Sequence, residues 1–299
     1  DIGHGLISSN QIKLSIVRNI FLLYLNINFF GVDMINGSLD FGLKDKVAII
    51  AGGGAVGQEI GNGRAASILL ADAGAKVLVA DKDEILAKNT FQMIKDRGGE
   101  AKYISGDLTK SEQCKKVVDY AISNWGRLDI LDNNIGIASK LSVVDETEEN
   151  WDYVMDVNLK PMFLMSKYAI PEMIRSGDGG SIVNISSISA TKPKGLTTYS
   201  ASKGAVLSLS QAMAVDHGVD GIRVNCILPG PVYTPMVYTP GMTKKLRSQR
   251  QDASLIQIEG DGWDIGKAVV YLCSNWARYI TGHLLVVDGG CSLSAKPRG

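Results

Sequence analysis

Histidines and closely spaced cysteines are scarce in this chain of 299 residues, which contains 3 histidines and 4 cysteines. The cysteines are Cys114, Cys226, Cys273 and Cys291, and none of them forms a C-x-x-C pair. No histidine lies at metal-ligand spacing from a cysteine, so we expect no metal site and a reduced, cytoplasmic protein. A Ser-His-Asp hydrolase is also disfavoured, because histidines are few and the motif G-x-S-x-G is absent.

Net charge and long apolar runs are lacking as well. The 31 basic and 31 acidic residues leave a formal net charge of zero, so the composition indicates no nucleic-acid or membrane-surface partner. The apolar run from Ile20 to Phe30 is too short for a membrane span, which needs about 20 residues. The sequence therefore predicts neither kind of partner.

The beginning of the chain differs in composition from the rest. Residues 1–33 are rich in Ile, Leu, Asn and Phe, and Met34 opens a stretch that reads like a natural start. We expect residues 1–39 to be an N-terminal extension outside the main folded domain, with residues 1–33 an addition or translated upstream sequence. N-terminal sequencing of protein from the native source tests the second interpretation, which a start before Met34 would contradict.

Short β-branched runs and amphipathic segments alternate from Lys46 onward. The pattern predicts helices with Ser111 as an N-cap and Pro161 as a kink. Strands that are apolar on both faces belong in a buried parallel sheet, and strand–helix alternation implies right-handed crossovers. We therefore predict an α/β fold: a single doubly wound (Rossmann) domain, 40–299, with a seven-stranded parallel sheet and helices on both faces. The predicted strands are 47–52, 76–81, 101–107, 128–134, 181–187, 222–230 and 283–290, and the predicted helices are 64–73, 83–97, 111–125, 151–175, 198–217 and 266–275.

A glycine-rich loop, AGGGAVGQEIGNGRAAS, follows the first predicted strand. Glycines between a strand and a helix let backbone N–H groups approach a pyrophosphate, and the helix N-terminus adds its dipole. Two registers are open: Gly52 with the two glycines after it, or Gly57, Gly61 and Gly63, with Asn62 between the last two. The alternative is an ordinary flexible turn that binds no ligand.

An acidic residue, Asp81, ends the second predicted strand. A carboxylate at this position can bind both ribose hydroxyls and would repel a 2′-phosphate, which favours NAD over NADP. Lys82 and Arg64 lie nearby in the sequence and either could reach a phosphate, so NADP stays open as the less favoured cofactor.

Tyr199 and Lys203 stand four residues apart in the stretch TTYSASKGAV. Residues at i and i+4 share one face of a helix, so these side chains form either a surface pair or a proton-transfer pair. The tyrosine pKa of about 10 is too high for a base at neutral pH, and we expect the nearby ammonium to lower it.

The order of these motifs resembles that of the classical short-chain dehydrogenase/reductase family over roughly residues 43–293. The motifs are the glycine loop, Asp107-Leu108, Asn133-Asn134-Ile135-Gly136, Tyr199-Ser-Ala-Ser-Lys203 and Pro229-Gly230-Pro231-Val232. Each motif alone is weak, whereas the ordered set is specific.

The resemblance implies a role for individual positions. Asp107 and Leu108 match the pair that contacts adenine, and Asn134 and Gly136 belong to the turn beside the adenosine half of the cofactor. The residues that match the catalytic tetrad are Asn158, Ser187, Tyr199 and Lys203. The residues that match the nicotinamide-holding segment are Pro229, Gly230, Val232 and Thr234.

Three positions depart from the family pattern. Ala51 stands where threonine is usual, Ile135 replaces an alanine and crowds its turn, and Asp132 replaces an apolar residue in a buried strand. The carboxylate of Asp132 requires a partner that the sequence does not identify. None of these departures affects the tetrad.

The resemblance implies an oxidoreductase that moves a hydride between a nicotinamide and a secondary alcohol or ketone. Segment 233–262 matches the family's mobile lid; its apolar residues suit a hydrophobic or cyclic substrate, and its basic residues leave an anionic one open. Alternatives are a 3-oxoacyl reductase of fatty-acid type, against which Asp81 counts, and a catalytically silent cofactor-binding regulator. Enoyl reductases of the superfamily space the tyrosine and lysine more widely, so we set them aside.

Helices around 155–175 and 200–217 match those that pair subunits in the family. The resemblance therefore implies a homo-oligomer, either a tetramer or a dimer.

Overall fold

The computed structural model describes residues 34–35, 38–238 and 241–293, and the chain divides into two units between Asp40 and Phe41. In the first unit, β1 (Met34–Ile35) pairs antiparallel with β2 (Ser38–Leu39). The prediction made for residues 1–33 lies outside the described residues.

The second unit contains a fully parallel seven-stranded sheet. Its strands are β3 (Val47–Ala51), β4 (Lys76–Asp81), β5 (Ala101–Ser105), β6 (Ile130–Asn133), β7 (Gly180–Ile185), β8 (Ile222–Pro229) and β11 (Leu284–Val287). The order across the sheet is β11-β8-β7-β6-β3-β4-β5. The predicted sheet is confirmed, and most predicted strands run one or two residues too far into the loops.

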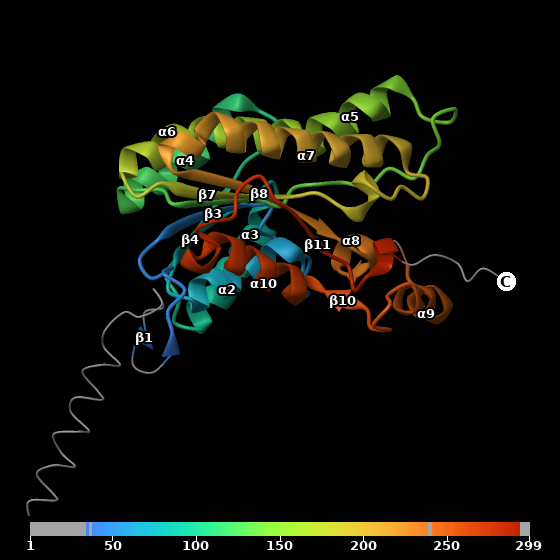
Figure 1. Cartoon of the computed structure of the whole chain (residues 1–299), viewed down its shortest axis with the longest axis horizontal. Coiled ribbons are helices and arrows are strands. Elements are labelled where there is room, and N and C mark those ends of the chain that lie inside the picture. Colours follow the sequence, from blue (N-terminus) through green and yellow to red (C-terminus); the bar gives the residue numbers. More distant parts are fainter. Residues whose placement is uncertain (1–33, 36–37, 239–240, 294–299) are drawn as a thin grey trace, which may run out of the picture. The chain divides into compact units, whose positions relative to one another are not determined.

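Helices cover both faces of this sheet (Figure 1). On one face lie α2 (Asn62–Asp72), α3 (Glu84–Asp96) and α10 (Gly262–Cys273). On the other face lie α4 (Ser111–Trp125), α6 (Lys160–Ser176) and α7 (Thr197–His217), with α5 (Glu148–Asn158) packed beside α7. Every residue of β3 is buried, because helices cover both of its faces.

Two local predictions are wrong in detail. The helix predicted over 151–175 is two helices, α5 and α6, which meet at Leu159. Pro161 lies in the first turn of α6, where its missing N–H costs no hydrogen bond. The N-cap of α4 is Lys110, without a side-chain cap, because the Ser111 hydroxyl is 2.7 Å from the Tyr168 hydroxyl instead.

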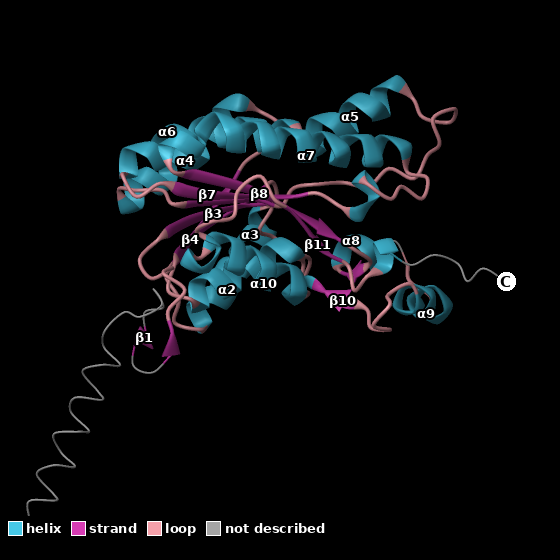
Figure 2. Ribbon diagram, viewed as in Figure 1, coloured by secondary structure: helices cyan, strands magenta, loops and turns pink. Residues whose placement is uncertain are grey.

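The segment between β8 and α10 contains short elements that the sequence did not predict. They are β9 (Val232–Tyr233), α8 (Pro235–Tyr238), α9 (Lys244–Asp252) and β10 (Gly260–Asp261), drawn beside the end of the sheet in Figure 2. β9 and β10 pair in parallel, so the two ends of the lid segment (233–262) are tied together. Among the described residues, no helix is both long and apolar enough to cross a membrane.

Candidate active site

Two adjoining cavities lie beyond the carboxyl ends of the central strands. One, of about 330 Å³, contains Tyr199 and is called the Tyr199 cavity; the other, of about 510 Å³, contains Asp81 and is called the Asp81 cavity. They share the wall residues Gly52, Gly54, Asn134, Ile135, Gly136 and Met236, so they form one continuous groove. The groove crosses the sheet where β3 adjoins β6 and the strand order reverses, which is where open α/β sheets bind ligands.

The groove brings together most of the predicted site residues. Those lining the Tyr199 cavity are Gly52, Gly61, Asn62, Gly63, Asn134, Gly136, Ser187, Tyr199, Lys203, Pro229, Gly230, Val232 and Thr234. Those lining the Asp81 cavity are Gly52, Asp81, Asp107, Leu108, Asn134 and Gly136. Gly57 and Asn158 line neither cavity.

The glycine loop uses parts of both predicted registers. A Cβ atom on Gly63 would lie 2.2 Å from the Gly52 carbonyl oxygen, and one on Gly54 would lie 2.7 Å from Asp81 Oδ2. These approaches exclude side chains and leave a backbone-lined cradle at the N-terminus of α2. A helix N-terminus with free N–H groups suits an anion such as a pyrophosphate. Gly57 lies instead in the exposed part of the loop.

Arg64 holds the long loop in place. Its fully buried guanidinium donates to the carbonyl oxygens of Gly57 at 2.8 Å, Glu59 at 2.6 Å and Ala55 at 2.5 Å, and to Thr90 Oγ1 at 2.9 Å. Arg64 was one of the two residues that could have reached a cofactor phosphate. That prediction is wrong, because the donors of Arg64 are directed to acceptors of the protein itself.

Asp81 is fixed by two backbone donors at the end of β4. The Gly54 N–H donates to Oδ2 at 2.9 Å, and the Asp83 N–H donates to Oδ1 at 3.1 Å. Lys82 lines the same cavity. Asp107 accepts bonds from the Thr109 N–H and hydroxyl; burial works to raise the pKa of Asp107, but these bonds hold the pKa below its usual range.

Lys203 is a buried cation with few partners. Its Nζ donates to the Ile185 carbonyl at 2.9 Å and to the Ile135 carbonyl at 3.5 Å, and its exposed fraction is 4%. Burial disfavours the charged form and lowers the pKa of Lys203 to about 8. The ammonium group thus retains donor capacity at the wall of the Tyr199 cavity.

Asn158 lies behind the cavity wall and ties two elements together. Its Oδ1 accepts from the Ile137 N–H at 2.7 Å, and its Nδ2 donates to the Ile137 carbonyl at 3.0 Å and to Ser202 Oγ at 2.9 Å. The side chain therefore fastens the turn after β6 to α7, the helix that carries Tyr199 and Lys203.

Tyr199 differs from the prediction in its electrostatics. Burial raises its pKa above the ordinary tyrosine value, and the hydrogen bond with Ser187 offsets only part of that rise. The expected lowering by Lys203 is wrong for this structure, because the Lys203 ammonium is directed to the carbonyl oxygens of Ile185 and Ile135. Ser187 follows the end of β7, and its Oγ accepts from the Ser189 N–H at 3.1 Å.

The structure supplies the partner that Asp132 required. Asn134 Nδ2 donates to Asp132 Oδ2 at 2.8 Å, while Asp132 Oδ1 is buried without a partner among the described residues. Burial raises the pKa of Asp132 to about 7. The carboxyl group therefore orients Asn134, a residue that both cavities share.

Some residues of the groove were not predicted as site residues. Leu86, Ile185 and Ser186 line it, and the Ser186 hydroxyl donates to the Lys203 carbonyl at 2.7 Å. The signal for Ser186 was present, because it stands beside Ser187 directly after a predicted strand. No group of His, Cys, Asp or Glu side chains that could hold a metal ion occurs within the described ranges.

The lid segment contacts the glycine loop. The Tyr238 hydroxyl donates to Glu59 Oε2 at 2.6 Å, and Met236 and Val237 line the Tyr199 cavity. Arg247 and Arg250 both pair with Glu259, so these basic residues have protein partners. The apolar residues of the lid segment were expected to suit a hydrophobic substrate, but two of them, Leu246 and Leu255, are exposed and line neither cavity.

Comparison with known proteins shows which families and proteins this chain resembles. Residues 54–292 match a family model described as enoyl-(acyl carrier protein) reductase. The 2,5-dichloro-2,5-cyclohexadiene-1,4-diol dehydrogenase LinX of Sphingobium indicum is 37% identical, over 84% of this chain and 98% of that protein. A cyclopentanol dehydrogenase of Comamonas sp. is 34% identical, over 83% of this chain and 97% of that protein.

Two further proteins extend the comparison. The 3-oxoacyl-(acyl-carrier-protein) reductase FabG of Thermotoga maritima is 32% identical, over 83% of this chain and 98% of that protein. A solved short-chain type dehydrogenase/reductase from Mycobacterium ulcerans superposes with a TM-score of 0.79 at 28% identity, covering 86% of this chain and 93% of the other. With the family model and these relatives spanning most of its length, the chain belongs to the classical short-chain dehydrogenase/reductase family of oxidoreductases.

Proposed function

We propose that this protein is an NAD-dependent dehydrogenase that interconverts a hydrophobic or cyclic secondary alcohol and its ketone. The observation that carries the proposal is the convergence of Ser187, Tyr199 and Lys203 on the one cavity that also contains the glycine-loop cradle. A cradle that a Cβ atom would fill fits a dinucleotide, which supplies the hydride acceptor or donor when bound.

The preference for NAD rests on the acidic side of the groove. Asp81 is held by backbone donors in the Asp81 cavity and would repel a 2′-phosphate. Arg64 is committed to carbonyl oxygens, so of the two cations that could have favoured NADP only Lys82 lines the groove. Asp107, Leu108, Asn134 and Gly136 would hold the adenosine half.

Tyr199 acts in this proposal as the proton donor and acceptor. Its raised pKa keeps the phenol protonated at neutral pH, which suits a general acid in ketone reduction. Ser187 donates to the substrate oxygen and stabilises the charge that develops there. Lys203, whose ammonium keeps donor capacity at the same cavity, would help to orient the cofactor. Asn158 positions α7 and the turn after β6.

The substrate class is inferred from the lid side of the cavity and from the relatives. Met236, Val237 and Pro235 present apolar surface to the Tyr199 cavity. Two relatives, LinX and the cyclopentanol dehydrogenase, are named for ring alcohols. The FabG relative keeps a 3-oxoacyl reductase as a second candidate, against which Asp81 counts.

Assembly, location and domain limits complete the proposal. We propose a homo-oligomer that pairs through α5, α6 and α7, where Trp151 and Phe163 are exposed to 39% and 49%. Light scattering that gives a monomer mass would contradict this proposed assembly.

A reduced cytoplasmic protein is supported by four unpaired, buried cysteines. The catalytic domain is proposed to span 40–299, with the lid segment (233–262) over the substrate.

Cofactor reduction tests the proposal most directly. Wild type and Tyr199→Phe are assayed with NAD or NADP across cyclic and aliphatic secondary alcohols, with NADH binding followed by fluorescence. We expect turnover with NAD that falls by at least about 100-fold in the variant, while NADH binding persists. NADH binding without turnover of any alcohol or ketone would instead favour the catalytically silent regulator.

A further inference from the structure

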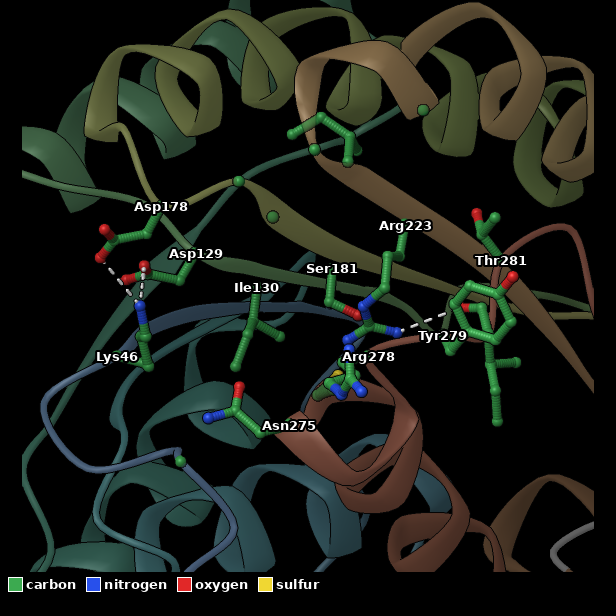
Figure 3. Close-up of a pocket in the computed structure, with 18 residues that line it drawn as sticks. Lys46, Asp129, Ile130, Asp178, Ser181, Arg223, Asn275, Arg278, Tyr279 and Thr281 are labelled. Atoms are coloured by element: carbon green, nitrogen blue, oxygen red, sulfur yellow. Dashed lines mark hydrogen bonds and ion pairs between the residues drawn. The ribbon is translucent and has the colours of Figure 1, made fainter. Parts of the chain in front are cut away.

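A separate cavity opens at the other end of the strands, where β7 and β8 begin. It has a volume of about 570 Å³ and is lined by the first residues of β7, Gly180 and Ser181, and of β8, Ile222 and Arg223 (Figure 3). We call it the Arg223 cavity. Tyr199 and the glycine loop lie instead at the carboxyl ends of the strands, so a β-strand of roughly 20 Å separates the two sites.

One end of the Arg223 cavity is neutralised by its own ion pairs. Lys46 Nζ lies 3.2 Å from Asp129 Oδ1 and 3.1 Å from Asp178 Oδ2. Arg127 contacts both of these carboxylates as well. Two cations therefore match two anions, and Figure 3 shows the Lys46 cluster at one end of the drawn residues, away from Arg223.

Arg223 has no such compensation. The side chain is half-buried, and its guanidinium makes only two hydrogen bonds, both near the limit of length: 3.3 Å to the Ile280 carbonyl and 3.5 Å to the Ser274 carbonyl. The Ile280 carbonyl already accepts a 2.9 Å bond from Asn225. No carboxylate in the described part of the chain pairs with Arg223.

The neighbouring thiol does not act as a counter-ion. Cys273 lines the same cavity, and burial raises its pKa to about 12, so it stays neutral at physiological pH. A cation drawn out of water without a paired anion is costly, so an anion close to Arg223 would be stabilising.

Arg278 adds a second unpaired guanidinium to the same wall. It is exposed, lines the cavity, and makes no ion pair with any residue that the structure describes. The amide of Asn275 and the ring of Tyr279, which is 96% exposed, also belong to this wall. Guanidinium groups bind carboxylates and phosphates through two parallel hydrogen bonds.

We propose that the Arg223 cavity binds a small multivalent oxyanion, a phosphate ester or a polycarboxylate, between Arg223 and Arg278. The cavity is larger than a single phosphate requires and lies within the size range of small-molecule sites, about 300–1,000 Å³. The ion pairs of Lys46 leave the two arginines as the cations available to a ligand. This site is independent of the proposed hydride transfer.

Titration calorimetry with inorganic pyrophosphate and with citrate, at constant ionic strength, tests the site. The wild type is compared with Arg278→Gln and with Arg175→Gln, a matched loss of one positive charge at a surface arginine of α6 that pairs with Glu172. We expect the dissociation constant of at least one probe to rise at least about tenfold in Arg278→Gln and to stay unchanged in Arg175→Gln. Pyrophosphate binding alone indicates phosphate esters, and citrate binding alone indicates polycarboxylates.

The glycine-loop cradle is the competing site for these probes, so each titration is repeated with saturating NADH. Binding that NADH removes and that Arg278→Gln leaves unchanged would overturn the proposal, as would the absence of binding by both probes. Arg223→Gln should weaken binding as well. Because Arg223 is half-buried, circular dichroism is used to check that the Arg223→Gln protein still folds. The test of the proposal therefore rests on Arg278→Gln, which changes an exposed residue.

Discussion

Two buried cations, Arg64 and Lys203, differ in their surroundings, and only Lys203 lines the groove. Arg64 is 0% exposed, and its guanidinium donates to the carbonyls of the glycine loop and to Thr90. Lys203 is 4% exposed and has one bond of 2.9 Å and one of 3.5 Å. Burial lowers the pKa of both groups, but the four hydrogen bonds of Arg64 offset more of its desolvation than the two bonds of Lys203 do.

The difference separates a structural cation from a functional one. The donors of Arg64 are used within the protein, so it fixes the loop and leaves little for a ligand. Lys203 keeps donor capacity directed at a cavity and carries the cost of desolvation, as reactive groups often do. Removing each cation should therefore have opposite effects on stability.

The largest effect is expected from Lys203→Met, which removes the ammonium and keeps much of the volume. Turnover should fall by about 100- to 1,000-fold, because a preorganised donor is lost from the reacting centre. The free energy of unfolding at pH 7 should rise by roughly 2 kcal/mol, since a lysine with a pKa of about 8 is penalised for its charge in the folded state.

Steady-state kinetics and urea unfolding measure the two effects. The folded-state pKa lies below the unfolded value, so wild-type stability should also rise between about pH 8 and pH 10.5, and the variant should lack this rise. A variant that loses stability at pH 7 would show that Lys203 is structural after all.

Arg64→Met should have the opposite effect on stability. Loss of the guanidinium leaves several carbonyl oxygens and Thr90 without a donor, so the free energy of unfolding should fall by about 3 kcal/mol. Arg64→Lys keeps the positive charge but loses the planar set of guanidinium donors, so its free energy of unfolding should lie between those of wild type and Arg64→Met. The free energies of unfolding are measured with urea. Equal values for all three proteins would contradict the conclusion that Arg64 holds the loop in place.

Asp132 extends the comparison to a buried anion. Its folded-state pKa, about 7, is raised above the unfolded value, so its contribution to stability should fall as the pH rises from about 4 to 7. Asp132→Asn preserves the bond to Asn134 and should be about 2 kcal/mol more stable than wild type at pH 8, with little difference at pH 4.

Thermal or urea unfolding across this pH range provides the measurement, and Asp152→Asn, at an exposed position of α5, is the matched control. Parallel pH profiles of wild type and Asp132→Asn would mean that the Asp132 carboxyl does not titrate in this window.

Local patterns made the parallel sheet predictable. The strands are short, apolar on both faces and bounded by glycine or aspartate, so seven parallel strands in a doubly wound sheet followed from the alternation with helices. The spacing of Tyr199 and Lys203 likewise indicated one helix face, which α7 provides. These features depend on residues close together in the chain.

Features that depend on distant contacts were not predictable. Arg64 was taken for a possible phosphate ligand, because its acceptors became visible only once the loop folded back over it. The Tyr199 pKa was misjudged in direction, since burial and the bonds of Lys203 to Ile185 and Ile135 are tertiary effects. The pairing of β9 with β10 joins segments about thirty residues apart and has no local signal.

The smallest effect is expected from the contact between Tyr238 and Glu59, which joins the lid segment to the loop that Arg64 holds. An exposed hydrogen bond contributes about 1 kcal/mol, so Tyr238→Phe should raise the KM for the cofactor about threefold and leave kcat unchanged. Glu59→Gln keeps an acceptor and should change KM less, and Tyr271→Phe, at an exposed position of α10, should not change it. Equal KM values for all four proteins would mean that the lid contact plays no part in cofactor binding. A fall in kcat for Tyr238→Phe alone would instead connect the lid to the chemical step or to product release.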